Sequence, residues 1–209
     1  MRSFLLLVFV VSMVGCGFSI RFDPNSVAPG DTIGVIAARG SFRTRSSTGT
    51  GTLNRSLVLD SNNIRVALRE LDLYQKVDLR FREEASRVMK TSFSRIAVAA
   101  AAASSDDEPY YIAAARKTGL DKVVLLTTYL ALIDISDPDK SYSWIPELTV
   151  GAEMIRTRDE RVLWRAKETA TGRSAIEAVN MPNLDAAFQP LVDEVVAELV
   201  AHLELPRGP

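Results

Sequence analysis

The sequence predicts a single α/β domain, in which helices cover a mixed β-sheet. Three observations support this class: apolar runs typical of strands alternate with segments of helical periodicity, a hairpin pattern occupies the second half, and an amphipathic helix follows it. The 209 residues are 47% hydrophobic and 24% charged, which is ordinary for a globular protein with a sizeable core. A formal net charge of -1 gives no indication of nucleic-acid binding. We place the domain at residues 31–205.

The N-terminus has the regions of an export signal. Arg2 supplies a positive charge, residues 4–11 form an apolar run, and the small residue Gly15 precedes Cys16, the single cysteine. The run is shorter than the about 20 apolar residues that cross a bilayer. Residues 13–16, Met-Val-Gly-Cys, resemble the lipobox of bacterial lipoproteins, in which the cysteine is acylated and becomes the new N-terminus. The alternative is an ordinary secretory signal in which Cys16 is incidental.

The lipobox resemblance implies a location and an anchor. Residues 1–15 would be the signal peptide, and lipid on Cys16 would hold the chain at a membrane. In enterobacterial lipoproteins an aspartate after the cysteine favours retention at the inner membrane. Gly17 at that position therefore implies a cell-envelope protein of the outer membrane that faces the periplasm. Residues 16–30, which contain two prolines and no periodicity, are predicted to be a tether.

The first strand is expected at residues 32–38, which are apolar on both faces. Residues 39–56 are rich in Ser, Thr, Gly and Arg and are predicted to form a long mobile loop. Its functional interpretation is a cationic arm for an anionic envelope polymer or for phospholipid head groups. The alternative is a solvated insertion that its arginines keep soluble. The arginines of this segment are Arg39, Arg43, Arg45 and Arg55.

The middle of the chain is predicted to alternate between helix and strand. A helix is expected from Ser61 or Asn62 to residue 73, and residues 76–82, where apolar and charged side chains alternate, are expected to form a half-exposed strand. Two helices then follow, at residues 83–105 and 107–118.

The second half is predicted to supply the centre of the sheet. A long strand is expected at residues 122–135, followed by a hairpin of strands at 148–155 and 161–171. The C-terminal amphipathic helix begins at Asn183 or Gln189, and its apolar stripe is expected to cover one face of the sheet.

This order of elements resembles a broad group of bacterial envelope lipoproteins. Residues 119–121 (Gly-Leu-Asp) match the turn before the long strand of that group, and residues 159–164 (Asp-Glu-Arg-Val-Leu-Trp) match its hairpin turn and Val-Leu-Trp. The group includes the meningococcal-type lipoproteins, the penicillin-binding-protein activator lipoproteins and the N-terminal region of the curli-secretion lipoprotein. Their fold is related to the N-terminal domain of the Tol-Pal translocation protein. The resemblance implies that Trp164 is structural and transfers no catalytic role.

Few residues of the sequence point to catalysis. His202 is the only histidine, which excludes a zinc site built from several histidines, and a solvated or helix-cap role is expected for it. There is no phosphate-binding loop and no nucleophile elbow. Two acidic clusters are interpreted as a helix N-terminus (106–108) and as a polar loop (134–139) rather than as metal ligands. No catalytic residue, metal site or cofactor is predicted.

Two aromatic residues are candidates for a contact surface. Tyr142 and Trp144 lie between two prolines in a predicted loop, and exposed aromatic side chains are common interface anchors. The alternative is that they fold back onto the core. The candidate partner contacts are therefore Arg43, Arg45, Arg55, Tyr142 and Trp144.

Anchor, resemblance and missing catalytic groups together predict a lipid-anchored, non-enzymatic binding or assembly component of the cell envelope. The membrane is contacted through lipid on Cys16, and an envelope protein or peptidoglycan is the expected partner, with no nucleic acid. One alternative is a subunit of an oligomeric secretion or transport assembly. The other is a hydrolase of envelope polymers that uses Asp or Glu pairs, because the pairing of carboxylates is spatial.

Overall fold

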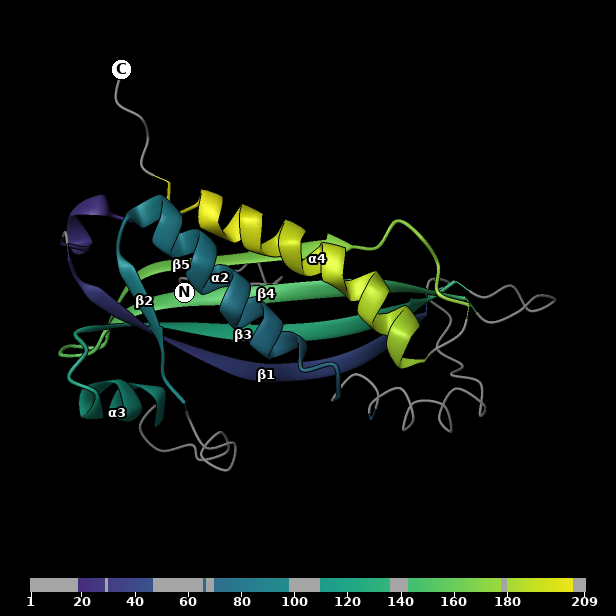
Figure 1. Ribbon diagram of the computed structural model, residues 1–209, viewed down its shortest axis with the longest axis horizontal. Coiled ribbons are helices and arrows are strands. Elements are labelled where there is room, and N and C mark those ends of the chain that lie inside the picture. The colour runs from purple at the N-terminus through teal and green to yellow at the C-terminus, as the bar shows by residue number, and fades with distance from the viewer. Residues whose placement is uncertain are drawn as a thin grey trace, which may run out of the picture.

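The computed structural model describes residues 19–28, 30–46, 66, 70–97, 110–135, 143–177 and 180–204. They form one α/β domain with a mixed five-stranded sheet, as the sequence predicts (Figure 1). The elements are η1 (Pro24–Ser26), β1 (Thr32–Ser46), α2 (Leu73–Met89), β2 (Ser92–Arg95), α3 (Tyr110–Lys117), β3 (Lys122–Asp134), β4 (Trp144–Arg156), β5 (Arg161–Thr171) and α4 (Met181–Ala201).

The strand order is β2-β1-β3-β4-β5. β1 is parallel to both β2 and β3, whereas β3, β4 and β5 form an antiparallel meander. Parallel neighbours need a crossover connection, and α2 and α3 lie in the two crossovers that lead from β1 to β2 and from β2 to β3. The predicted strands at 122–135 and 161–171 and the predicted helix at 107–118 are confirmed within one to three residues.

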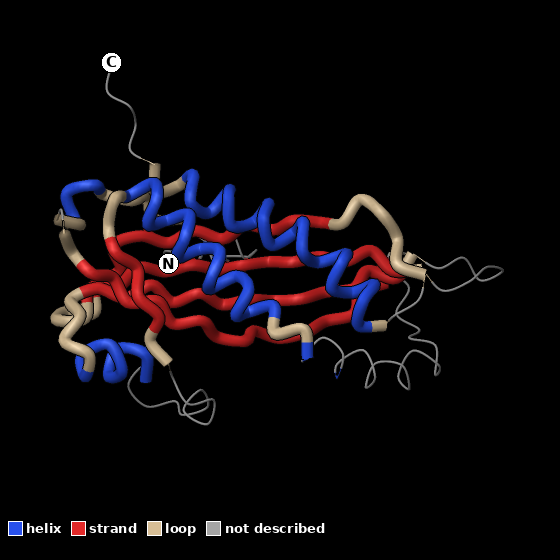
Figure 2. The backbone as a smooth tube through the Cα atoms, viewed as in Figure 1, coloured by secondary structure: helices blue, strands red, loops and turns tan. Residues whose placement is uncertain are grey.

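One face of the sheet is covered by α2 and α4, which run side by side across it (Figures 1 and 2). Asn180 caps α4 by accepting a hydrogen bond from the backbone N–H of Asn183 at 2.9 Å, so the helix starts near the first of the two expected positions. Ion pairs join the two helices, Lys76 to Asp185 and Arg80 to Asp193. The α4 residues buried against the sheet are Leu184, Phe188, Leu191, Val192, Val195, Val196, Leu199 and Val200.

The core beneath these helices contains an aromatic cluster. The ring of Phe81 in α2 stacks on Trp164 of β5 with centroids 6.4 Å apart, and it meets Phe93 of β2 edge-on at 6.0 Å. All three side chains are buried. Offset-stacked and edge-to-face pairs are favourable arrangements of aromatic rings, so this cluster joins α2 to both edge strands of the sheet.

The second face of the sheet carries a smaller apolar cluster at one end. There Ile112 and Ala115 of α3 pack with Ile36, Val123 and Ile155 of the sheet. Among the described residues, α3 is the only helix on this face, and it lies near one end of the strands (Figure 2). The second face is the surface to which the candidate site belongs.

The prediction of a loop from residue 39 onward is wrong for residues 39–46, which continue β1. These residues pair with β3 from Arg39 to Ser46, with a register shift between Arg39 and Phe42. Phe42 packs against the main core. A Ser- and Arg-rich sequence can therefore form a strand when its backbone pairs with a neighbouring strand and a side chain such as Phe42 packs against the core. Residues 47–56 lie outside the described part of the chain.

The prediction of a strand at residues 76–82 is also wrong, because this segment lies within α2. The residues that α2 buries include Leu73, Val77, Phe81 and Ala85, which recur every four residues, as the inner face of a helix requires. Leu79, which completes the apparent alternation, is 51% exposed. The predicted helix at 83–105 likewise ends early, since α2 stops at Met89 and Ser92–Arg95 forms β2.

Part of the predicted tether contacts the domain. Ile20 and Arg165 exchange backbone hydrogen bonds of 3.0 and 3.1 Å, and Phe22 and Val27 pack against the main core. The helix expected from Ser61 or Asn62 lies almost entirely outside the described residues. Within the described ranges, the structure contains no helix long and apolar enough to cross a membrane.

Candidate functional site

The candidate site lies on the second face of the sheet, and side-chain alternation decides which residues reach it. Along β4, Leu148 and Val150 are buried under the helices, whereas Glu147, Thr149 and Gly151 are only half-buried and lie on the opposite face. The strand pairing extends this division to β3 and β5. Polar residues that follow a period of two on adjacent strands therefore form continuous rows across the second face.

Two such rows cross the face beside each other. In the first, Tyr129, Thr149 and Thr169 are register partners on β3, β4 and β5, and the hydroxyl oxygens of Thr149 and Thr169 are 2.8 Å apart. In the next, Gly151 pairs with Lys167 of β5. Nothing lies within 4 Å of the position that a Cβ atom would take at Gly151. The missing side chain leaves open space beside Lys167 on this face.

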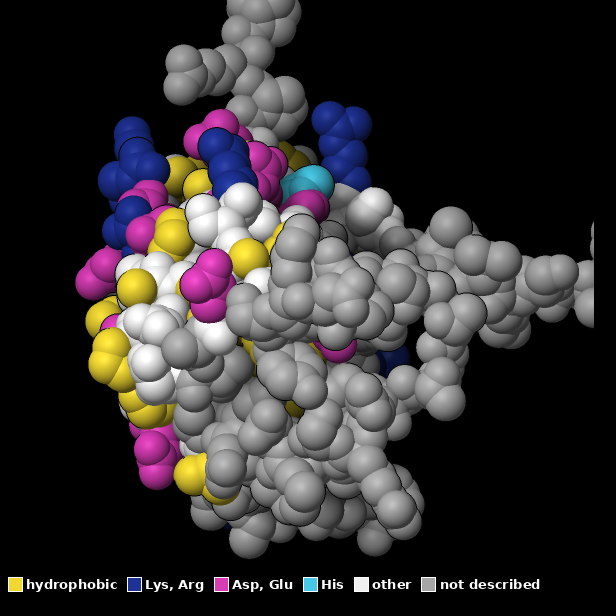
Figure 3. Space-filling model, turned by 90° about the vertical axis from the view of Figure 1, so that its right-hand side faces the viewer, with side chains coloured by type: hydrophobic (Ala, Val, Ile, Leu, Met, Phe, Trp, Pro, Cys, Tyr) yellow, Lys and Arg dark blue, Asp and Glu magenta, His cyan; other side chains and the backbone are white. Residues whose placement is uncertain are grey.

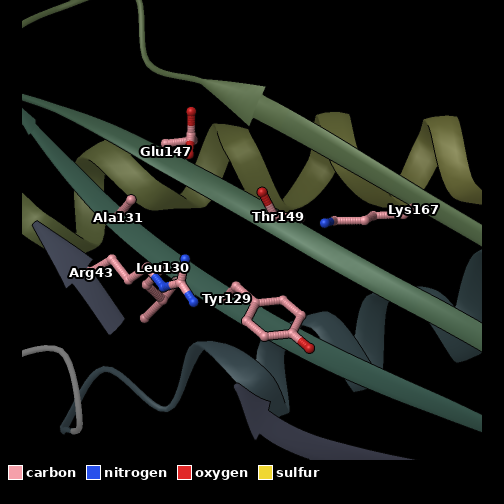
Figure 4. Close-up of a pocket in the computed structure, with 7 residues that line it drawn as sticks. All are labelled: Arg43, Tyr129, Leu130, Ala131, Glu147, Thr149 and Lys167. Carbon is pink, nitrogen blue, oxygen red and sulfur yellow. The ribbon is translucent and has the colours of Figure 1, made fainter. Parts of the chain in front are cut away.

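A hollow of about 260 Å³ lies at this point of the second face (Figure 4). The side chains shown there come from four strands, and Arg43 and Lys167 approach the hollow from opposite sides, with Thr149 between them. We call it the second-face hollow. Its lining residues are Arg43, Tyr129, Leu130, Ala131, Glu147, Thr149 and Lys167.

Gly40 determines where the ring of Tyr129 lies. It occupies the irregular part of β1, and a Cβ atom built there would be 2.5 Å from Cδ1 of Tyr129 and 2.6 Å from the carbonyl oxygen of Thr128. Only glycine permits that approach of ring and backbone. Tyr129 is 40% exposed, which is a high value for a large side chain in a central strand. The bulge in β1 thus holds an aromatic ring at the rim of the hollow.

The charges of the hollow are mainly cationic. Among the described residues, neither Arg43 nor Lys167 forms an ion pair. Glu147 does have an interaction partner. Farther along the face, Glu153 and Arg165 are register partners and form an ion pair of 2.8 Å. The side chains with donor capacity left over are therefore a guanidinium and an ammonium group, which suit acidic ligands.

The predicted contact residues are only partly brought together. Arg43 lines the hollow, and Arg45 lies two residues farther along β1, although its side chain is outside the described part. Cys16, Arg55 and Tyr142 also lie outside it. The expectation of an exposed Trp144 is wrong: it is the first residue of β4, is 4% exposed, and exchanges backbone hydrogen bonds with Ile176. For Trp144 the alternative of packing onto the core holds.

Sequence reasoning missed Tyr129, Glu147, Thr149 and Lys167. A signal was present, because polar residues alternate with apolar ones from Glu147 to Val150 in β4 and from Trp164 to Lys167 in β5. The pattern does not tell which face a helix covers, and it does not reveal that Gly40 and Gly151 create room. The site therefore depends on how four strands pair with one another, and a local sequence pattern does not predict that pairing.

Other polar clusters have structural roles. Near the start of β3, the ammonium group of Lys122 donates hydrogen bonds to Asp31 at 2.8 Å and Asp121 at 3.2 Å. The bond from Lys122 lowers the pKa of Asp31. Burial alone would lower the pKa of Lys122, but its two carboxylate partners outweigh burial and raise it. In the β4–β5 turn, hydrogen bonds from the Arg156 guanidinium lower the pKa of Asp159 to about 2.

His202 and the acidic clusters show no catalytic arrangement in the described part of the chain. His202 follows the last residue of α4, and its Nε2 atom lies 2.7 Å from Oε1 of Glu168. Asp134 ends β3, while residues 106–108 and 136–139 lie outside the described ranges. No group of three or more metal-ligating side chains occurs among the residues described. At the end of the molecule shown in Figure 3, acidic and basic side chains lie close together.

Fold and site define a small α/β domain whose sheet has one helix-covered face and one largely polar face. No protein-family model matches the chain, and no curated protein sequence matches it. Solved structures do resemble it. PelC from Paraburkholderia phytofirmans, solved as a dodecamer, is 12% identical over 90% of this chain and 100% of its own, with a TM-score of 0.42.

Two further solved structures belong to kinds of protein that the sequence resembles. Lipoprotein GNA1162 from Neisseria meningitidis is 11% identical over 83% of this chain and 97% of its own, with a TM-score of 0.33. The C-terminal domain of LpoB from Salmonella enterica is 14% identical over 70% of this chain and 86% of its own, with a TM-score of 0.28. The structural neighbours thus include bacterial lipoproteins. All three TM-scores are below 0.5, so these likenesses carry no statement about function.

Proposed function

We propose that this protein is a lipid-anchored, non-enzymatic binding component of the cell envelope, which captures its partner on the second face of the sheet. The observation that carries the proposal is the second-face hollow, where Arg43 and Lys167, which form no ion pair with any described residue, flank the exposed ring of Tyr129. The lipobox at residues 13–16 supplies the anchor. As Gly17 follows the cysteine, we place the protein at the outer membrane, facing the periplasm.

The partner is expected to carry carboxylates. A guanidinium and an ammonium group on one surface bind carboxylates through charge-assisted hydrogen bonds, and an aromatic ring adds an apolar contact. Peptidoglycan offers both kinds of group in a periplasm, because its stem peptides carry free carboxylates and its sugars have apolar faces. We therefore propose peptidoglycan as the partner. An acidic envelope protein is the alternative that the experiment distinguishes.

The mechanism is positional. The described chain that leads back toward Cys16 runs past η1 to Ile20, which exchanges backbone hydrogen bonds with Arg165 of β5, two residues from Lys167. Ile20 follows Cys16 by four residues, which span at most about 14 Å, so lipid on Cys16 would hold the domain, and the second-face hollow with it, near the membrane.

Within the described part of the chain, the second face offers no pair of carboxylates that fits the hydrolase alternative. Glu147 and Glu153 both lie on this face of β4, but six residues of strand place them roughly 20 Å apart. Glycosidases that use two carboxylates hold them about 5 to 10 Å apart. Binding without catalysis is therefore the function that this arrangement supports.

The test is sedimentation with purified peptidoglycan sacculi. Arg43→Glu combined with Lys167→Glu should reduce the bound fraction by about tenfold, as expected when two charge-assisted contacts turn repulsive. Arg161→Glu is the matched control, because Arg161 is an exposed cation on the same strand as Lys167 but lies at its other end. Gly151→Gln should also weaken binding, because it adds a side chain beside Lys167 at a position where a Cβ atom meets nothing within 4 Å.

Unchanged sedimentation of the charge-reversed variant would contradict the contact assignment. If the wild type fails to bind sacculi but cross-links to an envelope protein through a photoreactive residue at Tyr129, the second face is retained and the partner is a protein. The anchor is tested separately by intact mass and membrane fractionation of the wild type and Cys16→Ala. A wild type that is cleaved without added lipid would remove the anchor from the proposal.

A further inference from the structure

A second concave surface lies at the end of the domain where the N-terminal segment meets the helices. This N-terminal groove has a volume of about 700 Å³ and lies between the segment around η1, the last turn of α2 and the residues that follow α4. Its apolar lining comes from Phe22, Val27, Val88, Met89 and Leu203. All but Leu203 are only partly buried, so apolar surface faces the groove.

The polar rim of the N-terminal groove contains two cations, Arg87 and Lys90, and only Arg87 forms an ion pair with another described residue. Arg87 donates two hydrogen bonds to Oε2 of Glu84, the shorter being 2.6 Å. Lys90, in contrast, is exposed and has no ion-pair partner among the described residues. Glu204 is the one acidic residue of the rim. The groove thus combines an apolar wall with an available ammonium group at its edge.

The position of the groove relative to the anchor is fixed by chain length. Phe22 lines the groove and follows Cys16 by only six residues, which span at most about 20 Å even when fully extended. If Cys16 is acylated, as the proposed function requires, the groove lies within about 20 Å of the lipid anchor and can reach the surface of the bilayer. Its immediate neighbours are then the acyl chains and phosphate groups of membrane lipids.

We propose that the N-terminal groove binds an acyl chain of a membrane phospholipid, with Lys90 contacting the phosphate. An apolar groove takes up the chain through burial of hydrocarbon, and an ammonium group at a membrane surface is attracted to anionic head groups. Lipid in the groove fixes the domain relative to the membrane, so that the second-face hollow is presented in one orientation.

The experiment uses the purified full-length mature lipoprotein in bicelles that contain a phosphatidylglycerol with a photoreactive group in its acyl chain. After irradiation, mass spectrometry maps the adducts. We expect them on residues 88–91 and on residues 22–28. Val88→Trp, which fills the groove, should lower the yield at these residues by about fivefold, the factor that corresponds to about 1 kcal/mol. Lys90→Glu should lower it in the same direction without altering the apolar wall.

Leu79→Trp is the matched control, because Leu79 lies on the same helix, is 51% exposed, and is nine residues or roughly 14 Å away from Val88. Equal adduct yields at Leu79 and in the groove, or yields that Val88→Trp does not change, would overturn the proposal. The bicelles supply the probe whether or not Cys16 is acylated. Intact mass of the same sample reports acylation, so failure of the anchor and failure of the groove are distinguished.

Discussion

Trp164 lies where the sheet meets α2, and it explains why the hairpin carries a Val-Leu-Trp sequence. It is 1% exposed and stacks on Phe81, which in turn contacts Phe93 of the edge strand β2. The resemblance to envelope lipoproteins implies a structural role for this residue, and the packing agrees. The hairpin motif therefore contributes to the core, while Lys167 and Thr169 of the same strand lie on the second face.

Trp164→Ala should lower the free energy of unfolding by about 3 to 5 kcal/mol, because it removes a large buried ring and leaves a cavity beside Phe81. Urea titration followed by circular dichroism measures this change. Leu79→Ala serves as the control, since Leu79 is half-exposed and contributes little to the core. A loss below about 1 kcal/mol for Trp164→Ala would mean that the aromatic cluster is not the centre of the core.

Two glycines of the sheet should respond in opposite ways to the same substitution. Gly40→Ala places a methyl group 2.5 Å from the Tyr129 ring and 2.6 Å from a carbonyl oxygen, so we expect a loss of about 1 to 3 kcal/mol. Gly151→Ala meets nothing within 4 Å and should be neutral or stabilise by about 0.5 kcal/mol. Thermal or urea unfolding of both variants measures the difference. Equal effects would show that the approach of Tyr129 to Gly40 is not as close as described.

At the scale of elements, α2 shows what local pattern can and cannot predict. Apolar and charged residues alternate from Lys76 to Arg82, and a short window therefore favours a strand. The longer window from Leu73 to Ala85 has a spacing of four, and the helix forms because that spacing buries a stripe against the sheet. The strand prediction at β3 succeeded because that run is long and apolar on both faces, and the one at β5 succeeded because apolar and charged residues alternate from Trp164 to Lys167.

Asp78 joins α2 to β2. It is 1% exposed and accepts hydrogen bonds of 3.2 and 3.1 Å from Arg82, while Arg95 of β2 lies 3.7 Å away. Asp78→Ala should cost about 1 to 3 kcal/mol, because two arginines lose a buried carboxylate. Asp193→Ala, which removes a half-exposed partner of Arg80, should cost less than about 1 kcal/mol. Urea unfolding compares the two, and equal losses would contradict the buried link.

At the scale of the whole molecule, the fold class was predictable and the site was not. Helix and strand periodicities determine the layers, because each element must bury one face. The second-face hollow arises from Arg43, Tyr129 and Lys167, which lie on three different strands separated by up to 124 positions in the sequence. For Trp144 the sequence leaves an exposed position and a core position open, and its burial accompanies backbone pairing with Ile176, which lies 32 positions later in the sequence.

The stability of the whole domain should decrease in acid. Hydrogen bonds from Lys122, Arg87 and Arg156 lower the pKa values of Asp31, Glu84 and Asp159, the last to about 2. Each lowered pKa contributes stability above the unfolded value near about 4, and that contribution is lost as the pH falls through the folded value. The free energy of unfolding should therefore fall between about pH 4 and pH 2.

Asp31→Asn isolates one of these contributions. Lys122, whose side chain is 10% exposed, then retains only Asp121 as its partner, and we expect a loss of about 1 to 2 kcal/mol at pH 7 and a shallower acid dependence. Glu177→Gln, at an exposed position, is the control. Urea midpoints measured across this pH range test the expectation, and an unchanged acid slope would argue against the Asp31–Lys122 link.

The parallel pairing of β1 with β3 also has a consequence for the order in which the chain folds. Ile33 finds its partner Lys122 only 89 positions later, whereas the β3–β5 meander closes through short connections. Closing the long loop between β1 and β3 costs conformational entropy before any stabilising contact forms. We therefore expect β1 to join the sheet after the meander. If the chain is exported, as the proposed function requires, β1 would cross the membrane well before its partner β3 and would remain unpaired with it for most of the passage.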